Sequence, residues 1–304
     1  MLLSVGWAMG CALRYIFSIA WLVCFGTTTR AADIWISDDA NYSIVLEGTI
    51  KPGDYNKLQE LLNANCPKNS WNTLCPRGIF LASPGGSVGE AIQIGRLVRT
   101  LGLQAEIPEG DTDVFGSRDA ALSRLKLRNA RENYLCARAC FFVAIAGIDR
   151  LPYTERHRPL LGIHRPFLSD EELKTLNVNQ AMSYTVEIRS TIEAYLKEMG
   201  VPLRYAELMF SIPRDQIRWI TPAEYKADFS YLIPEIIDWL NAQCGSDMEF
   251  IKQLDTKPKY GTKYSPEELK ERDVLFGEMN KLSACRGSML TKMREEAWKA
   301  YRGL

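Results

Sequence analysis

Histidine is scarce in this sequence, because the 304 residues contain only His157 and His164. No two of the 8 cysteines form a Cys-x-x-Cys pair. Protein zinc sites are usually built from closely spaced cysteine and histidine ligands. The sequence therefore predicts no metal site, and no motif in it calls for a cofactor.

Net charge is absent as well. Lys+Arg and Asp+Glu number 37 each, so the formal charge is zero. Binding to nucleic acid or to an anionic membrane surface usually relies on an excess of basic residues. The composition therefore gives no support to a nucleic-acid partner. A hydrophobic content of 46% is enough to bury one main core with an appendage.

An apolar segment long enough to span a membrane is missing everywhere except at the start of the chain. Residues 15–25 are apolar, follow a single early charge at Arg14, and precede small residues at Ala31 and Ala32. This pattern predicts a secretory signal peptide over residues 1–32, and hence a periplasmic or secreted protein. The alternative is an uncleaved signal anchor, since residues 1–26 are long enough to span a bilayer. A membrane contact is expected only in that second case.

Six cysteines remain outside the signal segment, and they fall into three pairs along the sequence. An even number of cysteines in an exported chain favours disulfide bonds over free thiols. The sequence alone does not fix which cysteines are bonded. The sequence pairs are Cys66 with Cys75, Cys136 with Cys140, and Cys244 with Cys285.

A glycine turn lies between an apolar strand pattern and a helical one. Residues 78–81 have strand character, Pro84, Gly85 and Gly86 interrupt them, and apolar residues from Val88 onward recur at helical spacing. Glycine allows close approach to the main chain, so such a turn can direct free N–H groups at a developing oxyanion. An ordinary strand-to-helix turn is the other interpretation.

Two further motifs follow in order: a small-residue helix over residues 136–147 that ends in Ala-Gly, and a strand that ends in His164-Arg165-Pro166. Together with the glycine turn, they resemble the proteolytic subunit of Clp protease, over about residues 44–229. The resemblance implies an α/β fold of the ClpP/crotonase superfamily, a spiral of repeated strand-helix units. We expect this domain over residues 33–232, with a charged insertion at 109–133 and a C-terminal helical appendage at 233–304.

The resemblance also implies a catalytic triad, but its serine is missing here. Depending on the alignment, the nucleophile position falls on Arg138 or on Cys140. Arginine stays protonated and cannot attack a carbonyl, whereas Cys140 could act as a thiolate with His164. Cys136 lies one helical turn earlier, and helix geometry strains a disulfide at this spacing, so that bond requires an irregular first turn.

The remaining family positions are partly filled. His164 stands at the base position, and Asp215 is the candidate for the acid that orients it, although Pro213 is equally alignable. His157 lies in a charged turn and is expected to be solvated. The family's oxyanion donors would be the turn at Gly85 and Gly86 with the amide after the nucleophile position, which is Ala139 or Phe141 in the two alignments.

Two functions follow from the resemblance. The first is an exported Clp-peptidase-like protein with a degenerate nucleophile position, weak or no peptidase activity, and a retained peptide-binding groove. The alternative is an active exported hydrolase that uses Cys140 or another nucleophile with His164. The expected partner is a peptide or protein segment. A homo-oligomer is a further expectation, since the long helix near residues 179–199 often packs between subunits in this superfamily, although it can equally pack on its own core.

Overall fold

The computed structural model describes residues 31–37, 43–66, 75–110, 126–128, 133–150, 158–168, 170–229, 231–246 and 265–303. The predicted signal segment, most of the charged insertion at 109–133, and His157 lie outside this part of the chain. Within it, the fold is mixed α/β, as expected, with a mixed sheet and a long C-terminal helix.

A sheet of six strands forms the centre of the fold, in the order β1-β2-β3-β4-β7-β11. The inner strands β2, β3, β4 and β7 are parallel, and the two edge strands run antiparallel to their neighbours. Every residue of β2 and β3 is buried, as continuous apolar runs in a parallel sheet require. The bounds are β1 (Asp33–Ile36), β2 (Ser43–Glu47), β3 (Gly78–Ala82), β4 (Gln104–Glu106), β7 (Asp149–Arg150) and β11 (Tyr231–Leu232).

A smaller sheet lies next to the glycine turn. Its order is β10-β9-β6, and an isolated bridge between Ser83 and Cys136 joins the end of β3 to it. The segment after β3 therefore passes from the large sheet to the small one. The bounds are β6 (Cys136–Ala137), β9 (Leu161–Ile163) and β10 (Arg218–Trp219), while β5 (Glu109–Gly110) pairs separately with β8 (Arg158–Pro159).

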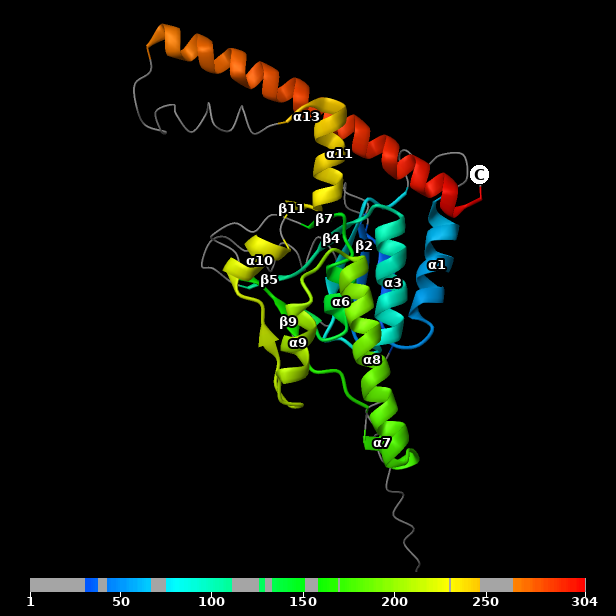
Figure 1. Ribbon diagram of the computed structural model, residues 1–304. Helices are drawn as coiled ribbons and strands as arrows, with labels where there is room; N and C mark the ends of the chain where they lie inside the picture. The colour runs from blue at the N-terminus through cyan, green and yellow to red at the C-terminus, as the bar shows by residue number, and fades with distance from the viewer. Residues whose placement is uncertain are drawn as a thin grey trace, which may run out of the picture.

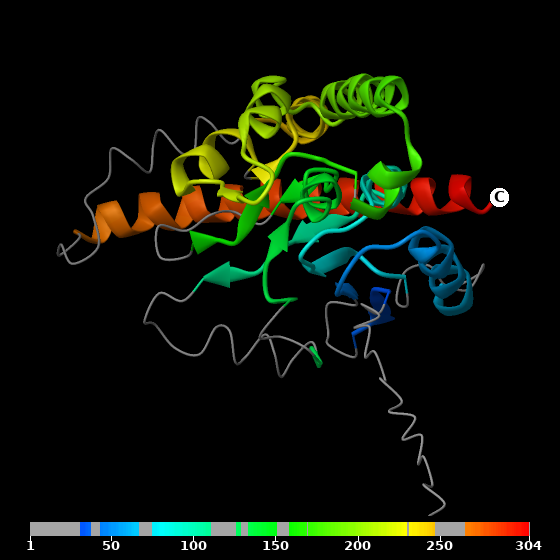
Figure 2. The ribbon, with the colours of Figure 1, turned by 90° about the horizontal axis from the view of Figure 1, so that it is seen from below.

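Helix α3 lies between α8 and α1 (Figures 1 and 2). The contact between α3 and α8 is close, because a Cβ atom at Gly95 would meet the hydroxyl of Tyr195 at 1.9 Å. That hydroxyl donates a hydrogen bond to the carbonyl oxygen of Phe142 at 2.8 Å, so one buried tyrosine ties α8 to both α3 and α6. The bounds are α1 (Asp54–Asn65), α3 (Val88–Thr100), α6 (Cys140–Ala144), α7 (Asp170–Thr175), α8 (Val178–Glu198), α9 (Arg204–Ser211) and α10 (Pro222–Asp228).

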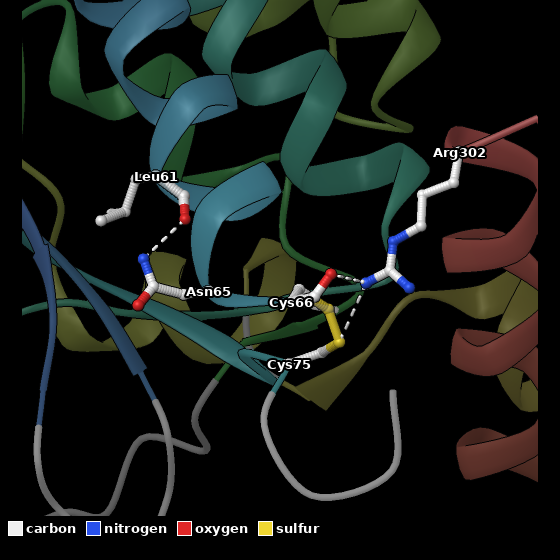
Figure 3. The surroundings of a disulfide bond; sticks show 5 residues. All are labelled: Leu61, Asn65, Cys66, Cys75 and Arg302. Atoms are coloured by element: carbon white, nitrogen blue, oxygen red, sulfur yellow. Dashed lines mark hydrogen bonds between the residues drawn. A yellow bond between two sulfur atoms is a disulfide. The ribbon is translucent and has the colours of Figure 1, made fainter. Parts of the chain in front are cut away.

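The predicted C-terminal appendage contains the helices α11 (Pro234–Cys244) and α13 (Pro266–Tyr301). Helix α13 runs across one end of the domain, and its N-terminal part extends beyond it (Figure 1). Its last turns pack on the main core, where Trp298 is 1% exposed. The guanidinium of Arg302 donates to the carbonyl oxygen of Cys66 at 2.5 Å (Figure 3). The end of this helix is therefore part of the main core, although its start is not.

The three cysteine pairs suggested by the sequence are disulfides in the structure, namely Cys66–Cys75, Cys136–Cys140 and Cys244–Cys285. The last bond joins α11 to α13. Three disulfides indicate a protein that matures in an oxidising, exported environment. Among the described residues, no helix combines the length and apolar character needed to cross a membrane.

Candidate functional site

A groove of about 1010 Å³ runs beside the glycine turn. Five segments form its walls: the β2–α1 loop, the glycine turn, the β6–α6 junction, the stretch after β9, and one face of α8. It thus brings together parts of the chain more than 100 residues apart. The lining residues that bear on its chemistry are Lys51, Gly85, Gly86, Gly89, Arg138, Ala139, His164, Arg165, Tyr184 and Glu187.

The glycine turn requires its glycines. Gly85 and Gly86 have φ angles of +105° and +142°, which residues with a Cβ atom rarely adopt. A Cβ atom at Gly85 would lie 2.5 Å from Cβ of Arg138, and one at Gly86 would lie 2.0 Å from the carbonyl oxygen of Ile50. The turn is therefore packed directly against the β6–α6 junction on one side and against Ile50 on the other.

Backbone pairing fixes the direction in which Gly86 points. The amide of Ile50 donates to the carbonyl of Gly85 at 2.8 Å, and the amide of Ser87 donates to the carbonyl of Ile50 at 2.9 Å. In extended chain, successive residues direct their hydrogen-bonding groups to alternate sides. The N–H and C=O groups of Gly86 therefore point away from Ile50, as those of an unpaired strand edge do.

Arg138 forms the junction between β6 and α6. Its φ of +55° is left-handed, which is uncommon for a residue other than glycine. Its amide donates to the carbonyl of Gly162 at 2.9 Å, and its own carbonyl accepts from the amide of Phe141 at 3.1 Å. The backbone is thus held on both sides while the side chain is exposed and lines the groove.

Cys140 lies on the other side of this junction and does not face the groove. It is 0% exposed, and its sulfur is bonded to that of Cys136. The bond forms because Cys136 belongs to strand β6 and Arg138 turns the chain before α6 begins, so the two cysteines do not share a regular helix. In this disulfide-bonded form Cys140 has no thiol to ionise, so the alternative pairing of a Cys140 thiolate with His164 is not present.

The backbone amides of Gly86 and Ala139 lie beside the groove, and neither is recorded as a donor to any residue that the structure describes. They are close to one another, since a Cβ atom at Gly85 would lie 2.9 Å from the amide nitrogen of Ala139. Phe141, the other candidate donor, is 0% exposed and its amide is used by Arg138. Of the two alignments considered for the oxyanion donors, the geometry therefore favours the one with Ala139.

His164 lies at the end of β9, is 6% exposed and lines the groove. Its Nε2 atom is 2.6 Å from the carbonyl oxygen of Arg214. A carbonyl oxygen only accepts, so this nitrogen is the donor. Burial lowers the pKa of His164, and the nearby cation of Arg138 lowers it further, against the hydrogen bond to Arg214, which raises it. The imidazole is therefore neutral at neutral pH.

No hydrogen bond between Asp215 and His164 is recorded among the described residues. The side chain of Asp215 is exposed, and its charge is the smallest of the influences on the pKa of His164. The recorded partner of Nε2 is instead the main-chain carbonyl of the preceding residue, Arg214. A neutral backbone group thus orients the imidazole, and it cannot stabilise an imidazolium as a carboxylate would.

Several groove residues were not singled out from the sequence. Lys51 and the loop around it are held by Asp54, whose buried carboxylate accepts from the amide of Lys51 at 2.8 Å. Tyr184 and Glu187 come from α8, and Arg165 follows the histidine. Of these residues, only Arg165 belongs to a motif singled out in the sequence, His164-Arg165-Pro166. The positive charge next to the histidine was the one signal in the sequence that could have pointed to it. The described residues contain no group of three or more histidine, cysteine or acidic side chains that could hold a metal ion.

Comparison with known proteins adds no family assignment. No protein-family model matches the chain, and no curated protein is significantly similar to it. The functional argument therefore depends on the geometry of the groove.

Proposed function

We propose that this protein is an exported member of the ClpP/crotonase superfamily whose groove binds an extended peptide segment without efficient peptide hydrolysis. Support for the fold comes from the parallel strands β2, β3, β4 and β7, from the glycine turn that joins β3 to α3, and from the histidine at the end of β9. Support for export comes from the three disulfides.

The observation that carries the proposal is the pair of residues at the nucleophile position. Arg138 occupies the junction beside the groove and has no nucleophilic atom, and Cys140 is buried in a disulfide. Loss of the nucleophile from a hydrolytic triad typically removes several orders of magnitude in rate, and leaves roughly 10³–10⁴ over water from oxyanion donors and binding. Turnover by this site would accordingly be very slow.

Binding can persist without turnover. The N–H and C=O groups of Gly86 face away from Ile50 and line the groove. An extended peptide can pair with such an edge as an added strand, with main-chain hydrogen bonds supplying affinity and wall residues supplying selectivity. Tyr184 and Ile188 on α8 also line the groove and supply apolar surface.

The test places a large side chain in the groove while leaving the glycine turn at Gly85 and Gly86 unchanged. Gly89 lines the groove, and a Cβ atom there would meet nothing within 4 Å, so Gly89→Trp is accommodated by the backbone. Gly277 on α13 has equally open surroundings far from the groove, and Gly277→Trp is the matched control. We expect the full-length oxidised protein to bind a pool of labelled decapeptides, measured by fluorescence anisotropy, and Gly89→Trp to weaken binding at least about tenfold.

Gly277→Trp should bind like the wild type, and mass spectrometry should find the peptides intact. Absence of binding by the wild type, or equal binding by both tryptophan variants, would contradict the proposal. Robust cleavage that disappears in Cys140→Ala and in His164→Ala would establish the hydrolase alternative instead. Gly86 is unsuitable for such a test, because any side chain there collides with Ile50 and affects folding.

A further inference from the structure

The groove has an uneven charge that the proposed function does not use. Three of its lining residues are cations, Lys51, Arg138 and Arg165, and one is an acid, Glu187. His164 adds no charge, because its lowered pKa keeps it neutral at neutral pH. The groove therefore carries an excess of positive charge within a chain whose formal net charge is zero. Such a field favours a ligand with negative charge.

Arg138 is a cation that lies beside the strand edge of the groove. A Cβ atom at Gly85 would lie 2.5 Å from Cβ of Arg138, so its side chain begins beside the residue that precedes Gly86. Among the described residues no carboxylate is recorded in an ion pair with it. Other surface arginines, such as Arg96 and Arg218, do pair with acids of this chain. An exposed guanidinium without such a partner can accept a carboxylate from outside, in bidentate geometry.

The backbone at Arg138 is held in a costly conformation. A left-handed φ is strained for a residue with a side chain, and glycine would avoid that strain. The arginine is nevertheless fixed there by hydrogen bonds of its amide and its carbonyl. Its position is thus set by the backbone, as is typical of residues at a binding site.

We propose that Arg138 binds the C-terminal carboxylate of a peptide that pairs with Gly86, so that the groove recognises chain ends. This inference rests on the proposed peptide-binding function and specifies its ligand. The main chain of an added strand lies in the plane of the hydrogen bonds to Gly86, and its terminal carboxylate continues that main chain. Side chains of an extended peptide project out of that plane, so an aspartate or glutamate side chain within the peptide is directed away from Arg138.

The test compares three pools of N-terminally fluorescein-labelled decapeptides of the same sequences. The first pool ends in a free carboxylate, the second in a carboxamide, and the third in a carboxamide preceded by one glutamate. Anisotropy titrations with the full-length oxidised wild type should show roughly ten- to hundredfold tighter binding of the first pool than of the other two. This range follows from the strength of a hydrogen-bonded ion pair.

Two variants locate the preference at Arg138. Arg138→Gln should bind all three pools alike, at the affinity of the wild type for the carboxamide pool, and Arg138→Lys should keep part of the preference because it keeps the charge. Equal wild-type binding of the first two pools, equally tight binding of the glutamate pool, or a preference that survives in Arg138→Gln would overturn this inference and leave the peptide-binding function standing. No binding of any pool by the wild type would overturn both.

Discussion

Three glycines in or near the groove allow the strain of the turn to be measured in parts. Gly85 has a φ of +105° and atoms of Arg138, Ala137 and Ala139 within 2.5–2.9 Å of its Cβ position. Gly53 has a φ of +98° but nothing within 4 Å. Gly89 is helical and also has nothing within 4 Å. Replacement by alanine thus tests backbone strain together with a steric clash at Gly85, backbone strain alone at Gly53, and neither at Gly89.

The expected losses of unfolding free energy follow from these surroundings. Gly53→Ala should lose about 1–2 kcal/mol, the cost of a side chain at positive φ. Gly85→Ala should lose about 2–5 kcal/mol, because backbone atoms at contact distance add about 1–3 kcal/mol of overpacking. Gly89→Ala should be neutral or gain up to about 1 kcal/mol from better helix propensity.

Urea unfolding of the oxidised protein, followed by the fluorescence of its tryptophans, measures all three differences under one set of conditions. The informative comparison is between Gly85→Ala and Gly53→Ala, since both substitutions carry the same strain in φ. A difference below about 0.5 kcal/mol between them, within the usual scatter of such measurements, would refute the close packing of the turn against Arg138 and Ala139. The geometry of the candidate site would then need revision as well.

Two further predictions concern buried basic side chains. Burial lowers the pKa of His164 in the folded protein. Below the unfolded pKa of about 6.5, the unfolded chain therefore binds a proton that the folded chain does not. The free energy of unfolding should fall as the pH drops through this range, by at most about 1.4 kcal/mol per pH unit. Urea titrations from pH 8 to pH 5 should show this slope in the wild type and a shallower one in His164→Gln, and equal slopes would count against it. Arg150, 6% exposed, donates to the carbonyls of Ile145, Met199 and Asp228. Arg150→Met removes all three bonds; Arg99 still donates to the carbonyls of Ile145 and Met199, so the carbonyl of Asp228 loses its side-chain donor. The substitution should cost about 1–3 kcal/mol in the same assay, whereas a loss below about 0.5 kcal/mol would show that those bonds contribute little.

The sequence predicted those parts of the fold that depend on patterns of neighbouring residues. The strand at residues 78–82, the glycine turn and the helix from Val88 to Thr100 are consecutive, and each has its own periodicity or turn chemistry. The long helix α8 was also predicted, because apolar residues recur at helical spacing from Tyr184 to Tyr195. Its role as a groove wall was not, since the approach of Tyr184 to the glycine turn depends on the packing of Tyr195 against Gly95.

The hydrogen-bond partner of His164 is a feature that sequence patterns could not predict. Sequence patterns identify side chains, so they led to the carboxylate of Asp215 as the partner of the imidazole. The recorded contact is with the main-chain carbonyl of Arg214, one residue earlier. Every residue carries such a carbonyl, and only the path of the loop before β10 decides which one meets the ring. No residue type at this position signals that contact.

In the segment from Cys136 to Cys140, one backbone turn decides both whether the disulfide forms and which residue faces the groove. From the sequence, the disulfide required an irregular first turn, and the nucleophile position was either Arg138 or Cys140. The left-handed φ of Arg138 is that irregular turn, and it allows the two cysteines to approach to 5.3 Å between their Cα atoms. The same turn exposes Arg138 to the groove and buries Cys140. The disulfide therefore stabilises the conformation that presents the arginine, and reduction of Cys136–Cys140 should weaken carboxylate binding and expose no nucleophile.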